Sequence, residues 1–342
     1  MTKGVLLAAP VLAGAALVVI ATRAPSNDPG GNCVRCHEMY DRTEAFHNST
    51  HRSVSCYDCH GGSMQMSNAV KMAKHGSEEV PEQLRLKHAH VVPVIEKCKS
   101  CHEQQFAEWK NGPHGITYKQ IFLDPKHNRE RPLMDDCLRC HGMHFEGGIA
   151  ELVSPLDSRG PWQFKDTSVT NDPAIPCLAC HSIHKHGEPA ANRMVRSKEL
   201  LRPSLSLFDR RDMQPIAAAV LPLPAMMDGS RPVKMSPDKR QALCYQCHAA
   251  NSAMQVASGD DRTPMGVHEG ISCVACHQKH GQDTRASCGT CHPRMSNCGR
   301  DVEKMDTTFV NKNSRHNIHF VKCADCHPKG VPKKPTLRAE LR

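Results

Sequence analysis

The chain has 342 residues and a formal net charge of +9, and Phe, Tyr and Trp together make up only 4% of it. Aromatic side chains usually supply much of the buried area of a core, so a chain of this length with so few of them needs something else to fill its interior. The basic charge raises the question of a nucleic-acid or anionic-membrane partner, but the sequence contains no RNA- or DNA-binding motif.

The first predicted element is an apolar helix at the N-terminus. Residues 4–22 carry no charge and lie between Lys3 and Arg23. Nineteen such residues just suffice to span a membrane and exceed the apolar part of a usual signal peptide. Because no clean cleavage site follows, we interpret residues 1–23 as a retained membrane anchor, with a cleaved export signal as the alternative.

A pentapeptide of the form C-x-x-C-H begins at Cys33 and occurs nine times in the chain. It is the attachment signal for a c-type haem. Two thiols three residues apart lie on one side of a helical turn, where they can bond to the two vinyl groups of one porphyrin. The histidine that follows is the proximal ligand of the iron.

The alternative reading of a C-x-x-C pair is a zinc knuckle or a redox dithiol. A histidine follows every one of the nine pairs, although histidine is only 23 of 342 residues. The sequence therefore predicts nine covalently bound haem c groups. The attachment residues are Cys33, Cys36, Cys56, Cys59, Cys98, Cys101, Cys137, Cys140, Cys177, Cys180, Cys244, Cys247, Cys273, Cys276, Cys288, Cys291, Cys323 and Cys326. The proximal ligands are His37, His60, His102, His141, His181, His248, His277, His292 and His327.

Nine large apolar porphyrins would fill the interior that the aromatic side chains leave empty. We therefore expect a mainly irregular, haem-packed multihaem cytochrome c with short α-helices, little or no β-sheet, and one N-terminal transmembrane or signal helix. Each ferric haem adds a charge of roughly −1 when both propionates ionise, so nine haems would offset the basic chain. Lys and Arg are then propionate partners, and no nucleic-acid partner is expected.

The stretch from residue 31 to residue 62 resembles the start of the membrane-anchored quinol-dehydrogenase cytochromes of the NapC/NirT/NrfH family. The shared features are the anchor, a first motif extended to C-x-x-C-H-x-M, and a histidine ahead of the second motif. The resemblance implies that Met39 ligates the first haem beside a quinol site at the membrane face, with ordinary packing of Met39 as the alternative. That family usually carries four or five haems, so nine is a departure from it.

Fourteen histidines outside the motifs are candidates for the second axial position. His51 and His268 each precede a motif by five residues, whereas His144, His184 and His280 each follow a proximal histidine by three. A histidine of the second kind cannot bend back to the opposite face of its own haem, so each should serve a neighbouring haem. The further candidates are His114, one of His88 and His90, and one of His316 and His319.

The longest gap between motifs runs from Cys177 to Cys244 and contains a Pro- and Met-rich stretch. This gap predicts a haem-free linker or lid. The expected organisation is an anchor or signal at 1–23, a five-haem region at 24–190, the linker at 191–235 and a four-haem region at 236–342. Cys298 lies outside every motif and could be a buried inert thiol, a reactive thiol, a bond to a partner or an axial ligand.

Two classes of function remain. The first is an electron-transfer conduit on the periplasmic side of the cytoplasmic membrane, which passes electrons from the membrane quinol pool to a periplasmic or membrane redox protein. The second is a multihaem oxidoreductase that acts on nitrogen or sulfur compounds at one haem with an open axial position. Ammonia-forming nitrite reductases replace one proximal histidine with lysine, and this chain contains no C-x-x-C-K. The surplus of histidines favours the conduit, which needs no catalytic residue. With a cleaved signal, the protein would be periplasmic.

Overall fold

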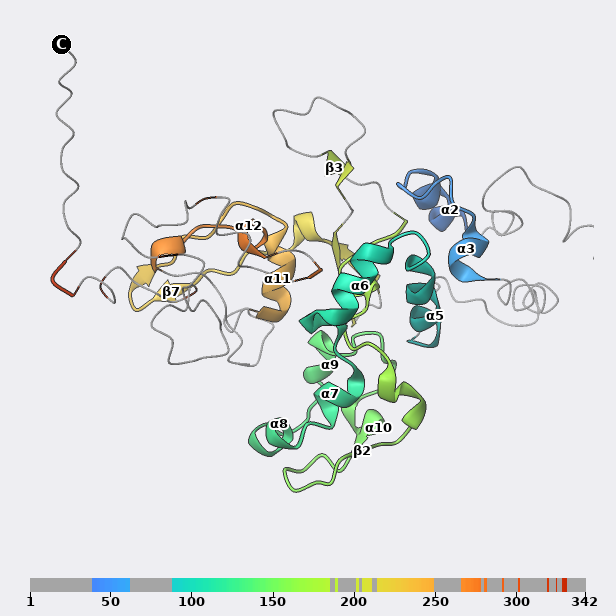
Figure 1. The fold of residues 1–342 in the computed structure, drawn as a ribbon, viewed down its shortest axis with the longest axis horizontal. Coiled ribbons are helices and arrows are strands. Elements are labelled where there is room, and N and C mark those ends of the chain that lie inside the picture. Colours follow the sequence, from blue (N-terminus) through green and yellow to red (C-terminus); the bar gives the residue numbers. More distant parts are fainter. Residues whose placement is uncertain are drawn as a thin grey trace, which may run out of the picture. The chain divides into compact units, whose positions relative to one another are not determined.

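The computed structural model describes residues 39–61, 88–184, 188–189, 201–202, 205–210, 214–248, 266–277, 280–281 and 328–330, and the single residues 291, 301, 319 and 324. These residues form short helices and short paired strands (Figure 1). The chain divides into two compact units. The first unit comprises Met1–His102 and His181–Ser204, and the second comprises Glu103–Cys180 and Leu205–Arg342.

The described elements of the first unit are three helices and one hairpin. They are α2 (Tyr40–His47), α3 (Cys56–His60), α5 (His88–Cys98) and the antiparallel strands β3 (Glu188–Pro189) and β4 (Leu201–Arg202). Helix α3 packs against α5. On α5, Val91 and Ile95 are four residues apart and therefore share a face, and both are buried.

The second unit contains more numerous but equally short helical segments. The α-helices are α6 (Glu103–Asn111), α7 (Tyr118–Phe122), α8 (Pro125–Glu130), α9 (Cys137–Cys140), α10 (Ile149–Leu152), α11 (Gln241–His248) and α12 (Cys273–Cys276). The 3-10 helices are η3 (Pro113–Gly115), η4 (Thr167–Asn171), η5 (Cys177–Ala179), η6 (Ala218–Val220) and η7 (Gly266–His268).

One side-chain core lies in the second unit around α7. The rings of Tyr118 and Phe122 stack with centroids 5.6 Å apart, and neither residue is exposed to solvent. Leu138 belongs to the same core and is also fully buried. Because Leu138 directly follows Cys137, this core anchors the helical turn that carries the fourth C-x-x-C-H motif.

Three hairpins complete the second unit. They pair β1 (Val153–Ser154) with β2 (Gln163–Phe164), β5 (Ser206–Asp209) with β6 (Gln214–Ala217), and β7 (Met227–Asp228) with β8 (Arg231–Pro232), all antiparallel.

The segment between the fifth and sixth motifs contributes to a second core. Strand β5 and η6 contact α11, and Ala218 and Leu221 cluster with Ala242 and Leu243. Leu243 directly precedes Cys244. The described part of residues 191–235 therefore supports the sixth motif through hairpin packing.

The prediction of a helical and irregular chain with little sheet is confirmed, since the described strands are only two to four residues long. The expected N-terminal anchor or signal at residues 1–23 lies outside the described residues. Within the part of the chain that is described, no helix has the length and apolar character needed to cross a membrane.

Candidate functional site

Three of the described C-x-x-C-H motifs, which begin at Cys98, Cys137 and Cys273, form the same helical turn, whereas the fifth forms the 3-10 helix η5. The carbonyl of the first cysteine accepts a hydrogen bond from the N–H of the motif histidine, at 2.8 Å for Cys98 and 2.9 Å for Cys137 and for Cys273. This bond spans four residues, as in an α-helix, so it holds the two cysteines on one side of the turn. It also fixes where the histidine leaves the turn.

The helical turns of the second and seventh motifs each begin directly after a serine. Ser55 precedes Cys56, and its hydroxyl accepts a hydrogen bond from the N–H of Tyr57 at 3.2 Å. The carboxylate of Asp58 accepts from the Ser55 N–H in return, which completes a capping box. Ser272 precedes Cys273 in the same way, but its hydroxyl donates to Asp238 at 2.9 Å instead.

In the first unit, two motif histidines each face a histidine from another part of the chain. The ring centroids of His51 and His102 are 6.1 Å apart, and those of His60 and His184 are 6.2 Å apart. His184 follows the fifth motif by three residues but faces the proximal histidine of the second. It thus lies beside a motif other than its own.

In the second unit, the same arrangement occurs twice. The ring centroids of His114 and His248 are 6.1 Å apart, and those of His277 and His319 are 6.0 Å apart. His114 is placed by η3, which follows α6. The α6 residue Trp109 is nearly buried and donates its indole N–H to the Ile175 carbonyl at 3.0 Å.

These separations fit a haem iron held between two imidazoles. A metal–imidazole bond is about 2 Å long and a ring nitrogen lies roughly 1 Å from its centroid, so two imidazoles on opposite sides of one iron have centroids about 6 Å apart. The porphyrin supplies the other four ligands, so two protein side chains complete the site. The described residues contain no group of three or more His, Cys, Asp or Glu side chains placed to hold a metal ion by themselves.

Burial in the first unit favours the neutral form of three of its paired imidazoles, those of His51, His60 and His184. Burial and, to a lesser extent, repulsion from His60, Arg42 and His51 together lower the pKa of His184 to about 4. Burial also lowers the pKa of His51 and of His60. Neutral imidazole is the form that binds a metal, so these side chains are in the ligand form at neutral pH.

A buried aromatic side chain that the sequence analysis did not single out supports one of these pairs. The ring of Phe46 meets that of His184 edge-on, with centroids 6.3 Å apart and planes at 86°. Phe46 is buried on α2. A phenylalanine in a mostly polar helix is a weak sign that this residue is buried, and nothing in the sequence connects it to His184.

The remaining candidate axial ligands that are described lie in varied surroundings. His144 is buried and stacks on Phe208, with ring centroids 3.9 Å apart. His90 lies near enough to His60 to lower its pKa, and His88 begins α5. Further placements are Met39 before α2, His268 at the end of η7, and His280 with its carbonyl beside Gly112.

Cysteines of different motifs come together within each unit. In the first unit, Cys98 and Cys101 lie near enough to Cys59 to raise its pKa further, after the larger effect of burial. In the second unit, the thiols of Cys247 and Cys140 are in hydrogen-bond contact, and each bond of this kind raises the pKa of the donor. None of the described cysteines forms a disulfide with another described cysteine.

The sixth motif contacts a second neighbour through its other thiol. Cys244 is hydrogen bonded to Cys273 of the seventh motif, and this bond together with burial raises the pKa of Cys244. Cys180 of the fifth motif lies near enough to Cys244 and Cys247 to raise the pKa of both thiols. Burial raises the pKa of Cys180 itself to about 11. Motifs that are far apart in the sequence therefore converge around α11.

Several predicted site residues lie outside the described part of the chain. They are Cys33, Cys36, His37, Cys288, His292, His316, Cys323, Cys326 and His327, and the unassigned Cys298 is also outside it. Of the eighth motif, only Cys291 is described among its cysteines and histidine.

The sequence matches the family described as cytochrome c554 and c-prime over residues 97–182 and 224–278. The matched residues are less than half of the chain and cover the third to seventh motifs. The match indicates a c-type cytochrome with covalently bound haem c and a role in electron transport. No curated protein and no solved structure matches the chain.

Proposed function

We propose that this chain is a nine-haem conduit that takes electrons from the membrane quinol pool and passes them to a periplasmic or membrane redox protein. The haems are fixed by the nine C-x-x-C-H motifs, and the protein lies on the periplasmic side of the cytoplasmic membrane through its N-terminal helix. Its task is transport of electrons along the haems, and apart from the oxidation of quinol at its membrane end it performs no chemistry on a small substrate.

The observation that carries the proposal is the set of four histidine pairs. Each pair joins one motif histidine to one histidine outside the motifs, at 6.0–6.2 Å between ring centroids. An iron between two imidazoles has no open position for a substrate. It also keeps the same ligands in both oxidation states, so little rearrangement accompanies each electron transfer.

Contacts between motif thiols support a series of closely spaced haems. Cys140 contacts Cys247, and Cys244 contacts Cys273. Each of these sulfurs would be bonded to the edge of a porphyrin. The haems of the fourth, sixth and seventh motifs would then follow one another at short edge-to-edge distances.

The membrane end of the proposal rests on the sequence. The uncharged residues 4–22 precede the first motif directly, and the segment from 31 to 62 resembles the quinol-dehydrogenase cytochromes. Met39 or a histidine would complete the first haem close to the membrane face, where a quinol can approach.

Electron paramagnetic resonance of the oxidised full-length protein tests the conduit. We expect low-spin ferric signals alone. Nitrite or hydroxylamine added to the oxidised protein, and carbon monoxide added to the reduced protein, should not bind rapidly to any haem. A high-spin haem that binds hydroxylamine or nitrite and turns it over would contradict the conduit. It would place an oxidoreductase active site at that iron.

The quinol donor is tested separately. Residues 1–23 are replaced with a cleavable export signal, and reduction of the haems by a quinol analogue is compared with that of the native membrane-bound protein. We expect the soluble form to keep its haems and to be reduced more slowly. Equal rates for the two forms would remove the anchor from the mechanism.

A further inference from the structure

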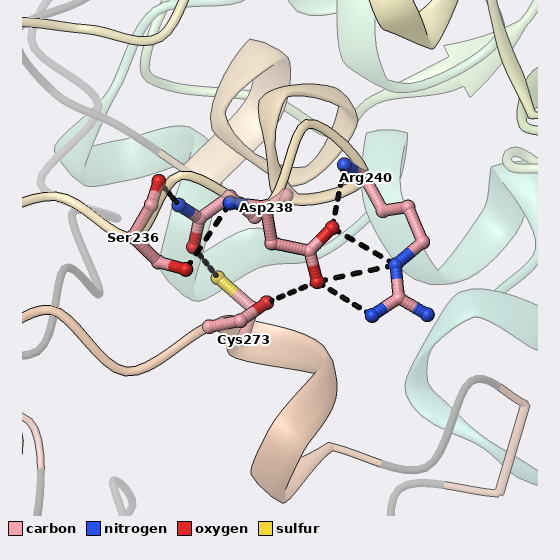
Figure 2. A network of polar contacts seen from close by, with 6 residues as sticks. Ser236, Asp238, Arg240 and Cys273 are labelled. Atoms are coloured by element: carbon pink, nitrogen blue, oxygen red, sulfur yellow. Dashed lines mark hydrogen bonds and ion pairs between the residues drawn. The ribbon is translucent and has the colours of Figure 1, made fainter. Parts of the chain in front are cut away.

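A polar network connects the residues just before the sixth motif with those just before the seventh (Figure 2). The carboxylate of Asp238 accepts hydrogen bonds from the Arg240 side chain, the shortest at 2.6 Å from Nη2, and from the Arg240 backbone N–H at 3.0 Å. It also accepts from the Ser272 hydroxyl at 2.9 Å. Arg240 directly precedes α11, which carries Cys244, and Ser272 directly precedes α12, which begins at Cys273.

A buried glutamine forms a second part of the network. The side chain of Gln241 is fully buried and donates to the Ser236 carbonyl at 2.6 Å. Its side-chain oxygen accepts from the Cys273 thiol at 3.7 Å. The bond from Cys273 to Gln241 and the contact between Cys244 and Cys273 both depend on a thiol hydrogen. This hydrogen is lost when haem attachment converts the thiol to a thioether. The bond from Ser272 to Asp238 depends on no thiol, so conversion of the cysteines to thioethers removes neither its donor nor its acceptor.

A second contact holds the same two segments side by side. Glu269 accepts from the Arg231 side chain at 2.8 Å and from the Lys234 N–H at 2.6 Å. The side chain of Lys234 also lies against Gly270, which adopts a left-handed backbone with φ of +83°. The segment that leads into the seventh motif is therefore held along the segment that leads into the sixth.

The use of Ser272 contrasts with that of Ser55. The two serines occupy equivalent places in HRSVSC and HEGISC. Ser55 caps its own helix, whereas Ser272 makes no side-chain cap to α12 and bonds to Asp238 instead. A local helix cap is thus replaced by a bond to a residue 34 positions away, which is expected where the relative placement of two motifs matters.

We propose that Asp238 is a positioning residue that fixes the separation between the haems of the sixth and seventh motifs. Its carboxylate links the start of α11 to the start of α12, and each of these turns carries the cysteines of one haem. The inference rests on the proposed function in one respect, namely that both motifs carry haem. Two neighbouring irons interact electrostatically, so the reduction of one lowers the potential of the other by an amount that depends on their distance.

The test compares four variants of the full-length, haem-loaded protein. D238N removes the charge that holds Arg240 and Ser272, and S272A removes the bridge alone. S272T keeps a hydroxyl at the bridge and is the conservative rescue. D157N is the matched control, because Asp157 accepts from the backbone and side chain of Arg159 at 2.8 and 3.0 Å in the same local pattern but on an exposed loop.

Haem content is first measured by intact mass, and the reduction potentials are then titrated with a chemical reductant while the ferric signals are followed by electron paramagnetic resonance. We expect D238N and S272A to shift two of the reduction steps and to alter the signals of one interacting pair. S272T and D157N should leave both readouts as in the native protein. Should D238N fail to accumulate, S272A and S272T still provide the comparison.

Unchanged potentials and signals in S272A with full haem content would overturn the positioning role. Neither readout uses quinol or a redox partner. A protein that fails to oxidise quinol, or that contains a catalytic haem, would therefore refute the proposed function while the effect of S272A on the haem pair remained measurable.

Discussion

The imidazole of His184 lies 6.2 Å from that of His60, measured between ring centroids, although the two come from the two separate stretches of sequence that make up the first unit. His184 is half-buried and meets the ring of Phe46 edge-on, and its pKa is lowered to about 4. A neutral imidazole in this position would be placed to serve as the second axial ligand of a haem attached at Cys56 and Cys59.

The first prediction concerns this ligand. Changing His184 to Met should leave haem attachment intact, because the cysteines are untouched. It should raise the potential of one haem by on the order of 0.1 V, since a thioether ligand favours ferrous iron. Potentiometric titration followed in the visible spectrum measures the shift.

His47→Met is the control, because His47 is exposed at the end of α2 on the same unit. It should leave every potential unchanged. An unaltered titration for His184→Met would show that His184 is not a ligand.

The second prediction is the number of haems. All nine motifs should carry haem, so the intact mass of the mature chain should exceed that of the polypeptide by nine haem groups. Replacing both Cys288 and Cys291 with Ala should lower the number to eight, because both thioethers of one haem are lost. Cys298→Ala should leave nine, and a native mass with eight or fewer would show that a motif is unused.

The third prediction concerns pH. Hydrogen bonds from Arg240 lower the pKa of Asp238 to about 2 from 3.8. Because the folded-state pKa lies below the unfolded one, the carboxylate stabilises the fold fully above about pH 5, and this contribution is lost as the pH falls from about 4 to about 2. Since the site is partly exposed, we expect D238N to lower the free energy of unfolding by about 1 kcal/mol at pH 6.

Denaturant titrations of the haem-loaded protein at pH 6 and pH 2.5 measure this difference. The gap between D238N and the native chain should narrow at the lower pH, where most of the carboxylate's contribution is lost. D157N should give a smaller gap at pH 6, because the side chain of Asp157 is more exposed than that of Asp238. A D238N gap that is equally large at both pH values would mean that the effect does not come from the carboxylate charge.

The fourth prediction concerns the glycine after the fourth proximal histidine. Gly142 has φ of +84°, and a Cβ there would lie 2.5 Å from the Tyr118 ring. Tyr118 is fully buried and cannot move aside. Gly142→Ala should therefore cost about 2–4 kcal/mol of unfolding free energy, from backbone strain and crowding combined.

Gly229→Ala separates these two causes. Gly229 has φ of +62° in the turn between β7 and β8, and nothing lies within 4 Å of its added Cβ. It should cost about 1 kcal/mol, from backbone strain alone. Equal losses for the two variants in denaturant titrations would show that Tyr118 does not restrict this position.

The local features of the molecule were accessible from the sequence. The C-x-x-C-H spacing predicts a helical turn because all its residues lie within one turn, and the turns at Cys98, Cys137 and Cys273 have the expected hydrogen bond. The short helices followed from the scarcity of aromatic residues. The family match supports the assignment of the chain to c-type cytochromes.

Contacts between residues that are distant in the sequence could not be predicted in the same way. The sequence indicated that His184 should serve a neighbouring motif, but the choice of His60 depends on how α2, α3 and the segment after the fifth motif pack. The pairing of β5 with β6 was likewise hidden, because Leu207 and Ile216 face each other across a turn without a repeated pattern. Asp238 and Ser272 are far apart in the chain, and no spacing rule connects them.

The two histidine pairs of the first unit, His51 with His102 and His60 with His184, interleave along the sequence. This order has a consequence for maturation of the protein. A haem held covalently at Cys98 and Cys101 and through its iron by His51 ties those two places together. A haem at Cys56 and Cys59 would likewise be tied to His184. Each haem then closes a loop of polypeptide much as a disulfide does, and the two loops overlap. Omission of one haem would open a loop that protects part of the other, so proteases could remove an incompletely loaded chain. The abundance of the protein in the cell would then follow the supply of haem.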